Sequence, residues 1–167
     1  MPRIIVPAFC AILALGGAAQ AASPKDLGKF GSWNAMSYGE GDDTRCYIAS
    51  RPTSMSPPQL NHGDVVFFVQ SRDDKDAHSE SSFQTGYSFA KDSMITVKIG
   101  DDSFQMFTQG QSAWLRRLER EGEFLAALKA GSSMTVDATS ARGNGTSYVF
   151  SLNGVTAAAR VLEQCDD

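Results

Sequence analysis

The chain has 167 residues, of which 42% are hydrophobic and 20% charged, with 15 glycines and 6 prolines. These values are typical of a globular domain and exclude a long disordered chain, a collagen-like repeat and a protein with several membrane spans. The formal net charge is −4, so no excess of positive charge draws the chain to nucleic-acid phosphates or anionic lipids, and we expect neither as a partner.

The first 22 residues have the pattern of a secretory signal peptide. Arg3 precedes an apolar run that ends at Leu15, and small residues follow up to Ala19-Gln20-Ala21, the form that signal peptidase accepts. The alternative is a membrane anchor, but the apolar run is well short of the roughly 20 residues that span a bilayer. We therefore expect a mature chain of residues 23–167, without stable membrane insertion, in the bacterial periplasm or outside the cell.

Removal of the leader also removes Cys10 and leaves two cysteines, Cys46 and Cys165. An even number of cysteines in an oxidising compartment is the setting in which structural disulfides persist, so we predict that these two pair. The alternative is two separate buried thiols. In the chain-entropy model, closing so long a loop stabilises a fold by roughly 4 to 5 kcal/mol.

Residues 23–89 predict short strands joined by irregular segments. Strand patterns lie at Trp33–Tyr38, Arg45–Ser50, Val65–Val69 and Phe83–Phe89. Between them we expect a loose lead-in at 23–32, an extended loop at 51–63 and a polar excursion at 72–82. The extended loop cannot pair along its length because three prolines, Pro52, Pro57 and Pro58, lack the amide hydrogen that a sheet requires.

Two features of this half carry further expectations. Val65–Val69 is an unbroken run of β-branched and aromatic residues, which is typical of a central strand covered on both faces. Gly86 falls inside a predicted strand, where a glycine indicates a bulge or a close approach of two backbones.

The second half predicts two hairpins and two helices. Met94–Ile99 and Ser103–Thr108 flank a Gly-Asp-Asp turn, and Ser133–Ser140 and Ser147–Leu152 flank a turn that contains Gly143 and Gly145. Apolar residues at helical spacing predict one helix at Glu121–Ala130, after an uncertain turn, and a C-terminal helix at Val155–Gln164.

Together these elements predict a mainly β fold. We expect a single-domain antiparallel β-sandwich with one or two short helices, including a C-terminal helix. A bridge from Cys46 to Cys165 would then hold the last helix against an early strand.

Few residues suggest catalysis or metal binding. The candidate metal ligands lack the spacing of a zinc site or a calcium loop and are interpreted as a solvated turn; they are His62, Asp64, His78, Asp73, Asp74 and Asp76. Ser112 lacks the surroundings of a nucleophile elbow, and Arg142 is interpreted as a cation at a rim. We therefore predict no catalytic residue, no metal and no cofactor.

Four aromatic residues allow two interpretations: Trp33, Trp114, Tyr87 and Tyr148. They could line a recognition surface, although aromatic residues in strands belong more often to a core.

A series of short motifs runs through nearly the whole mature chain. In order, it includes Trp33, Cys46-Tyr47, Ser50-x-Pro52, Gly63-Asp64-Val65, Gly86-Tyr87-Ser88-Phe89, Ala113-Trp114, Ser140-x-Arg142-Gly143, Gly154-x-Thr156-Ala157-Ala158 and Cys165. In this order the motifs resemble the invasion-associated locus B family of alphaproteobacterial exported proteins. Asn61-His62, where the family tends to have a basic residue, is a departure that falls in a predicted loop.

The resemblance implies a small exported protein, associated in pathogenic members with entry into host cells, and it supplies no catalytic residues. Our leading hypothesis is a non-enzymatic periplasmic or surface-associated binding protein that supports envelope interactions or host-cell invasion. Its partner would be an envelope or host-surface protein. The alternatives are an extracytoplasmic hydrolase and a small-ligand carrier. A pocket with converging histidine, serine and acidic groups would favour the hydrolase, and a dry apolar cleft would favour the carrier.

Overall fold

The computed structural model describes residues 23–72 and 77–165. Its strands are β1 (Lys25–Phe30), β2 (Trp33–Tyr38), β3 (Arg45–Ser50), β4 (Ser54–Ser56), β5 (Val66–Ser71), β6 (Ser79–Gln84), β7 (Met94–Ile99), β8 (Asp102–Gln109), β9 (Ser112–Leu115), β10 (Ser133–Thr139) and β11 (Gly145–Ser151). Its helices are α1 (Glu121–Ala130) and α2 (Val155–Cys165), with 3-10 turns at Gly41–Asp43 and Leu118–Arg120. The expected hairpins and both expected helices are confirmed.

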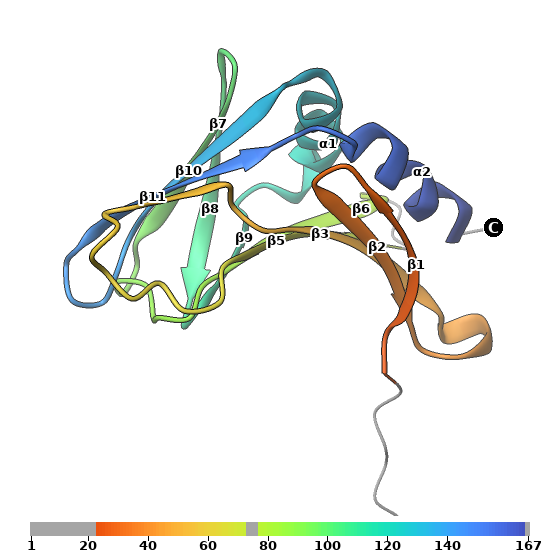
Figure 1. Cartoon of the computed structure of the whole chain (residues 1–167), viewed down its shortest axis with the longest axis horizontal. Helices are drawn as coiled ribbons and strands as arrows, with labels where there is room; N and C mark the ends of the chain where they lie inside the picture. Colours follow the sequence, from red (N-terminus) through yellow and green to blue (C-terminus); the bar gives the residue numbers. More distant parts are fainter. Residues whose placement is uncertain (1–22, 73–76, 166–167) are drawn as a thin grey trace, which may run out of the picture.

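All the strands of this part of the chain belong to one antiparallel sheet, in the order β1-β2-β3-β5-β6-β9-β8-β7-β10-β11-β4. The sheet bends so that β10 and β11 lie over β5 and β3 (Figure 1). Aromatic contacts join the two halves: Phe67 of β5 lies 5.9 Å from Phe150 of β11, and Phe83 of β6 lies 5.3 Å from Tyr148, measured between ring centroids. The mainly β, antiparallel class is confirmed, and the layers face each other within one continuous sheet.

The two helices cover one end of this folded sheet. Phe124 of α1 enters the core, where its ring lies 5.8 Å from Phe67 and 4.8 Å from Phe104 of β8. Helix α2 packs on β1, β2, β3 and β5. A disulfide joins Cys46 of β3 to Cys165 at the end of α2, with 5.9 Å between the two Cα atoms.

Strand β5 differs from the expectation that both of its faces are covered. Phe67 and Val69 are fully buried, whereas Val66 and Phe68 on the opposite face are only half-buried. The reason is that the helices and the facing half of the sheet all pack on the inner face, and no second layer from the described residues lies on the outer one.

Other segments expected to be irregular contain strands. The lead-in forms β1, which has no buried residue and whose pairing with β2 has a bulge near Gly28, so it shows no alternation. The polar excursion contains the start of β6, where the buried positions are Ser79 and Ser81. The turn expected before α1 is the 3-10 turn Leu118–Arg120, and the unexpected strand β9 precedes it. Strand β4 is a three-residue edge strand inside the extended loop.

Candidate functional site

A cleft of about 480 Å³ is lined by residues of three loops. These loops lie at the end of the folded sheet away from α2 (Figure 1). The loops are residues 57–63, residues 85–90 and the turn between β10 and β11. The cleft is lined by Leu60, Asn61, His62, Gly86, Tyr87, Ser88, Ser140, Ala141, Arg142, Asn144 and Thr146.

Two glycines set the first two loops against each other beside this cleft. A Cβ atom on Gly63, whose φ is +62°, would lie 2.6 Å from the Cα of Gly86. The amide of Gly86 donates a 3.0 Å hydrogen bond to the carbonyl oxygen of His62. The close backbone approach expected at Gly86 is therefore confirmed, and it places the side chain of His62 under the loop.

His62 belongs to a chain of buried polar groups. Its Nε2 lies 2.9 Å from the carbonyl oxygen of Pro57, and its Nδ1 lies 2.9 Å from the hydroxyl of Tyr148 on β11. That hydroxyl donates to the hydroxyl of Tyr87 at 2.8 Å, which lies 2.7 Å from Oγ1 of Thr146. Thr146 donates to the carbonyl oxygen of Ala138 at 3.3 Å. This series of hydrogen bonds connects all three loops.

The chemistry of the cleft does not match either alternative. Burial, and the hydrogen bond that it donates to Tyr87, raise the pKa of Tyr148, which keeps this hydroxyl neutral. Serine and histidine converge here, but among the described residues no carboxylate lines the cleft. A general acid-base pair with an acidic member is therefore not assembled at this position, and the polar walls are not those of a dry apolar cleft.

The other sequence candidates are scattered. His78 is exposed, and Asp64 is exposed and paired with Arg51 at 2.9 Å. Ser112 lies on β9 between Gln84 and Gln109 of the neighbouring strands. Asp73, Asp74 and Asp76 lie outside the described residues. Within residues 23–72 and 77–165, no three histidine, cysteine or acidic side chains gather closely enough to hold a metal ion.

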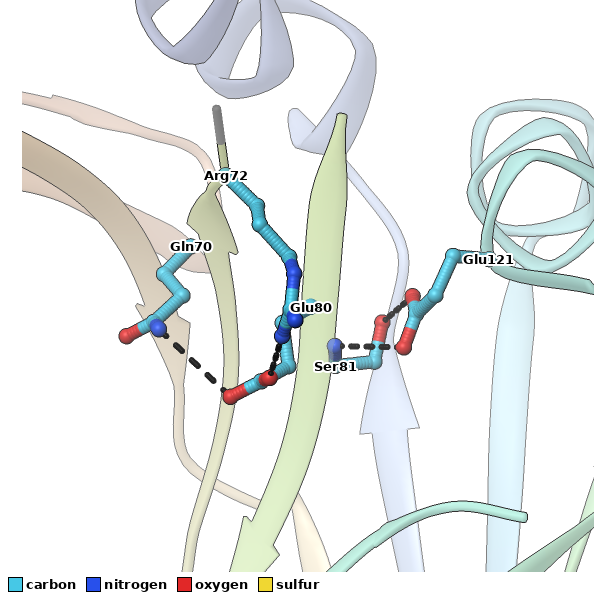
Figure 2. A network of polar contacts seen from close by, with 5 residues as sticks. All are labelled: Gln70, Arg72, Glu80, Ser81 and Glu121. Atoms are coloured by element: carbon cyan, nitrogen blue, oxygen red, sulfur yellow. Dashed lines mark hydrogen bonds and ion pairs between the residues drawn. The ribbon is translucent and has the colours of Figure 1, made fainter. Parts of the chain in front are cut away.

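A second polar cluster surrounds Glu121, the first residue of α1, and the sequence analysis did not find it (Figure 2). The carboxylate is 1% exposed and accepts hydrogen bonds from the amide of Ser81 at 2.8 Å and from its hydroxyl at 2.7 Å. Ser81 precedes the residues of β6 that pair with β9. The carboxylate of Glu121 therefore accepts the hydrogen bond of the Ser81 amide, which lies just beyond the paired residues of β6 and β9.

Burial raises the pKa of Glu121 to about 6, because removal from water disfavours the charged form, while the two hydrogen bonds from Ser81 oppose this effect. Beside it, Glu80 is paired with Arg72 and accepts a hydrogen bond from Gln70 (Figure 2). Glu121 thus has a complete set of structural partners, and we assign it a structural role.

The outer face of the sheet carries exposed apolar side chains. The strand register places Phe68, Ser82, Trp114, Phe107 and Met94 side by side on β5, β6, β9, β8 and β7. Phe107 is 43% exposed and Met94 is 37% exposed. The rings of Phe107 and Trp114 are stacked, with 5.7 Å between their centroids. We call Phe68, Trp114, Phe107 and Met94 the outer apolar row.

The four aromatic residues singled out in the sequence therefore have different environments. Trp33 and Tyr148 are fully buried, as the core interpretation predicts, and Tyr87 is half-buried at the cleft. Trp114 is half-buried on the outer face, where it fits the surface interpretation. Its position was not found because no strand was expected after Thr108, so the pairing of β8 with β9 that brings Phe107 beside Trp114 was missed.

No helix in the described part of the chain is long and apolar enough to cross a membrane.

The model of the invasion associated locus B (IalB) protein family matches residues 33–163. This chain belongs to the IalB family. The match includes the cleft, Glu121 and the outer apolar row, so all three features lie within the family domain.

A solved structure resembles this IalB family member throughout. The crystal structure of invasion associated protein B from Bartonella henselae superposes with a TM-score of 0.60, over 86% of this chain and 97% of that one. The two sequences are 14% identical, so this likeness establishes the shared fold. No curated protein matches the chain.

Proposed function

We propose that this IalB family member is an exported, non-enzymatic binding protein that acts in the periplasm or at the cell surface and docks an envelope or host-surface protein. Family membership makes the protein invasion-related, and the leader pattern supports export. The bound partner would support envelope interactions or, in an invasive bacterium, host-cell entry.

The observation that carries this proposal is the outer apolar row. Large apolar side chains that stay exposed side by side on a folded protein mark interaction surfaces more often than isolated ones do. Aromatic anchors supply much of the energy of protein interfaces. The stacked pair Phe107 and Trp114 offers such an anchor on a sheet face that the rest of the described chain leaves uncovered.

The polar surroundings of the row also suit a protein partner. A hollow of about 430 Å³ borders it and is lined by Arg72, Glu80 and Arg116, among others. Protein–protein interfaces typically combine an apolar centre with a polar rim. The row lies on strands of one sheet, and the rim residues lie on β6 or directly after β5 and β9, so the surface requires little ordering on binding.

The proposal is tested by capture from intact envelopes, with the purified mature protein as bait. The double variant Phe107→Thr/Trp114→Thr is expected to lose at least about tenfold in partner recovery, because each aromatic anchor contributes about 1 kcal/mol or more. The control is Met55→Thr, which removes another exposed apolar side chain, 42% exposed, from the edge strand β4.

Two outcomes contradict the proposal. One is recovery of the same proteins by the double variant and the native chain. The other is loss of the biological effect on substitution of His78 or Ser112 in a fully folded protein, which would favour an active site.

A further inference from the structure

The sequence contains two Asn-Gly pairs, Asn144-Gly145 and Asn153-Gly154. An asparagine before a glycine can lose its side-chain amide without an enzyme, because the glycine nitrogen attacks the side-chain carbonyl carbon and no Cβ stands in its way. The reaction requires an accessible side chain, a glycine amide without a hydrogen bond and room for the backbone to rotate. Because both pairs have the same two residues, a difference between them reports the effect of the fold.

Asn144 lines the cleft, in the turn between β10 and β11. The residue is exposed, and its side-chain amide forms no hydrogen bond with the described part of the chain. Ser140 holds only its backbone: the amide of Asn144 donates to the hydroxyl of Ser140 at 3.1 Å, and its carbonyl oxygen accepts from the amide of Ser140 at 2.9 Å. The side chain of Asn144 can therefore rotate towards Gly145.

The amide of Gly145 points away from β10. Hydrogen bonds between antiparallel strands fall on alternate residue pairs, and the amide of Ser140 donates to the carbonyl oxygen of Asn144. The next pair, Thr139 with Gly145, is therefore not hydrogen-bonded. On the other side of β11, pairing with β4 begins at Ser147, so none of the described residues accepts a hydrogen bond from the amide of Gly145. A Cβ on Gly145 would meet nothing within 4 Å.

The second pair is packed against the turn between β1 and β2. A Cβ on Gly154 would overlap the carbonyl oxygen of Phe30, and a Cβ on Gly31 would lie 3.2 Å from the side-chain carbon Cγ of Asn153. The carbonyl oxygen of Asn153 also accepts a 3.0 Å hydrogen bond from the amide of Ser32. The backbone rotation that the reaction requires would break this packing just before α2.

We propose that Asn144 is a site of spontaneous deamidation in the folded protein, which adds a carboxylate to the cleft, and that the fold protects Asn153. The nitrogen of Gly145 forms a bond to Cγ of Asn144, and the side-chain nitrogen leaves as ammonia with the proton of Gly145. Water then opens the cyclic imide at either carbonyl carbon, which gives aspartate or, with an additional main-chain carbon, isoaspartate. This modification site is separate from the outer apolar row and goes beyond the proposed docking function.

The first measurement compares the two asparagines while the mature, disulfide-bonded protein is incubated at mildly alkaline pH. Trypsin cleaves after Arg142 and Arg160, so both asparagines lie in the peptide of residues 143–160, where fragment-ion mass spectrometry measures each conversion. In the native protein Asn144 is expected to react at least about tenfold faster than Asn153, which packing protects. In urea with a reductant, the two rates are expected to become comparable. Equal native rates, or a faster reaction at Asn153, would overturn the proposal.

Matched glycine variants test the role of the attacking nitrogen. Gly145→Ala adds a Cβ beside it and is expected to slow the reaction of Asn144 at least about tenfold. The fold tolerates this change, because Gly145 has open space around it and no positive φ. Gly122→Ala, at another such position in α1, is expected to leave the rate unchanged. An unchanged rate in Gly145→Ala would contradict attack by this nitrogen.

The product is expected to change the cleft alone. The main-chain carbon added in isoaspartate displaces the hydrogen bonds between Asn144 and Ser140, and the new charge lies on the same turn as Arg142. In ¹⁵N-labelled protein, conversion is therefore expected to shift the backbone amide resonances of Ser140 and Ser88 and to leave that of Phe107 in place. Unchanged resonances at the cleft after conversion would overturn the proposed effect on it. None of these results bears on capture through the outer apolar row.

Discussion

At the scale of single residues, Glu121 links the stability of the fold to pH. Its pKa is raised to about 6 in the folded protein from its ordinary value of 4.5, so between these two pH values the folded state binds more protons than the unfolded state. The contribution of this group is therefore present below about pH 4.5 and is lost as pH rises through about 6. The shift corresponds to about 2 kcal/mol.

We predict that Glu121→Gln abolishes this contribution, because glutamine has nearly the same shape and no charge. Urea unfolding at pH 4.5 and pH 6.5 measures most of it: on raising the pH, the native chain is expected to lose about 1.5 kcal/mol more unfolding free energy than the variant. Other titrating groups, including the pair of Arg72 and Glu80, are common to both proteins and cancel. Equal changes in the two proteins would show that Glu121 is not the responsible group.

The contact of Gly63 with Gly86 supports a second prediction. Gly63→Ala places a Cβ 2.6 Å from the Cα of Gly86, whereas Gly110→Ala, at nearly the same φ of +63°, meets nothing within 4 Å. Both variants pay the left-handed strain of about 1 kcal/mol, so their difference measures the clash. Thermal unfolding is expected to show Gly63→Ala as the less stable variant by at least about 1 kcal/mol. Equal stabilities of the two variants would mean that the loops of Gly63 and Gly86 can move apart without a loss of unfolding free energy.

The candidate cleft was only partly predictable at this scale. Gly86 indicated a close approach and Arg142 a rim cation, and both lie at the cleft. The hydrogen bonds beside the cleft, however, join His62 to Tyr148, 86 residues away, and Tyr148 to Tyr87, 61 residues away. Sequence spacing contains no record of such contacts, because they depend on how the sheet folds over.

At the scale of secondary-structure elements, prediction succeeded where a buried face is apolar. The hairpin of β7 and β8 alternates clearly, and α1 has the same bounds as predicted. It failed for β6, whose buried positions begin with Ser79 and Ser81, and for β9, whose four residues are too few to show a period. Strand β1 was missed because backbone pairing with β2, rather than burial, holds it.

The disulfide belongs to this scale because it joins two elements, β3 and α2. We predict that reduction, or Cys165→Ser, loosens α2 more than the hairpin of β10 and β11, since the bridge anchors the chain end. Amide hydrogen exchange measures this: α2 amides are expected to exchange at least about tenfold faster after reduction, and β10 amides much less so. The bridge closes a separation of 119 residues, and its loss is expected to cost roughly 4 to 5 kcal/mol in the chain-entropy model. Unchanged exchange in α2 would mean that packing alone holds the helix.

At the scale of the whole molecule, a single sheet makes both layers of the fold. The β class and the helices were predictable from periodicity, but the continuity of the sheet was not, because it depends on pairings such as β6 with β9 and β10 with β7. This continuity has a functional consequence. It aligns the outer apolar row from β5, β9, β8 and β7, with Ser82 of β6 between Phe68 and Trp114, whereas the inner face and the helices form the core.

The central claim is that this outer row contacts a partner, and site-specific photo-crosslinking tests it most directly. A photoreactive phenylalanine analogue at position 107, in protein exported to the envelope, is expected to form one dominant adduct with another protein. The same analogue at position 55, an equally exposed site on β4, is expected to form none. Identical adducts at both positions, or no adduct at 107, would contradict the account.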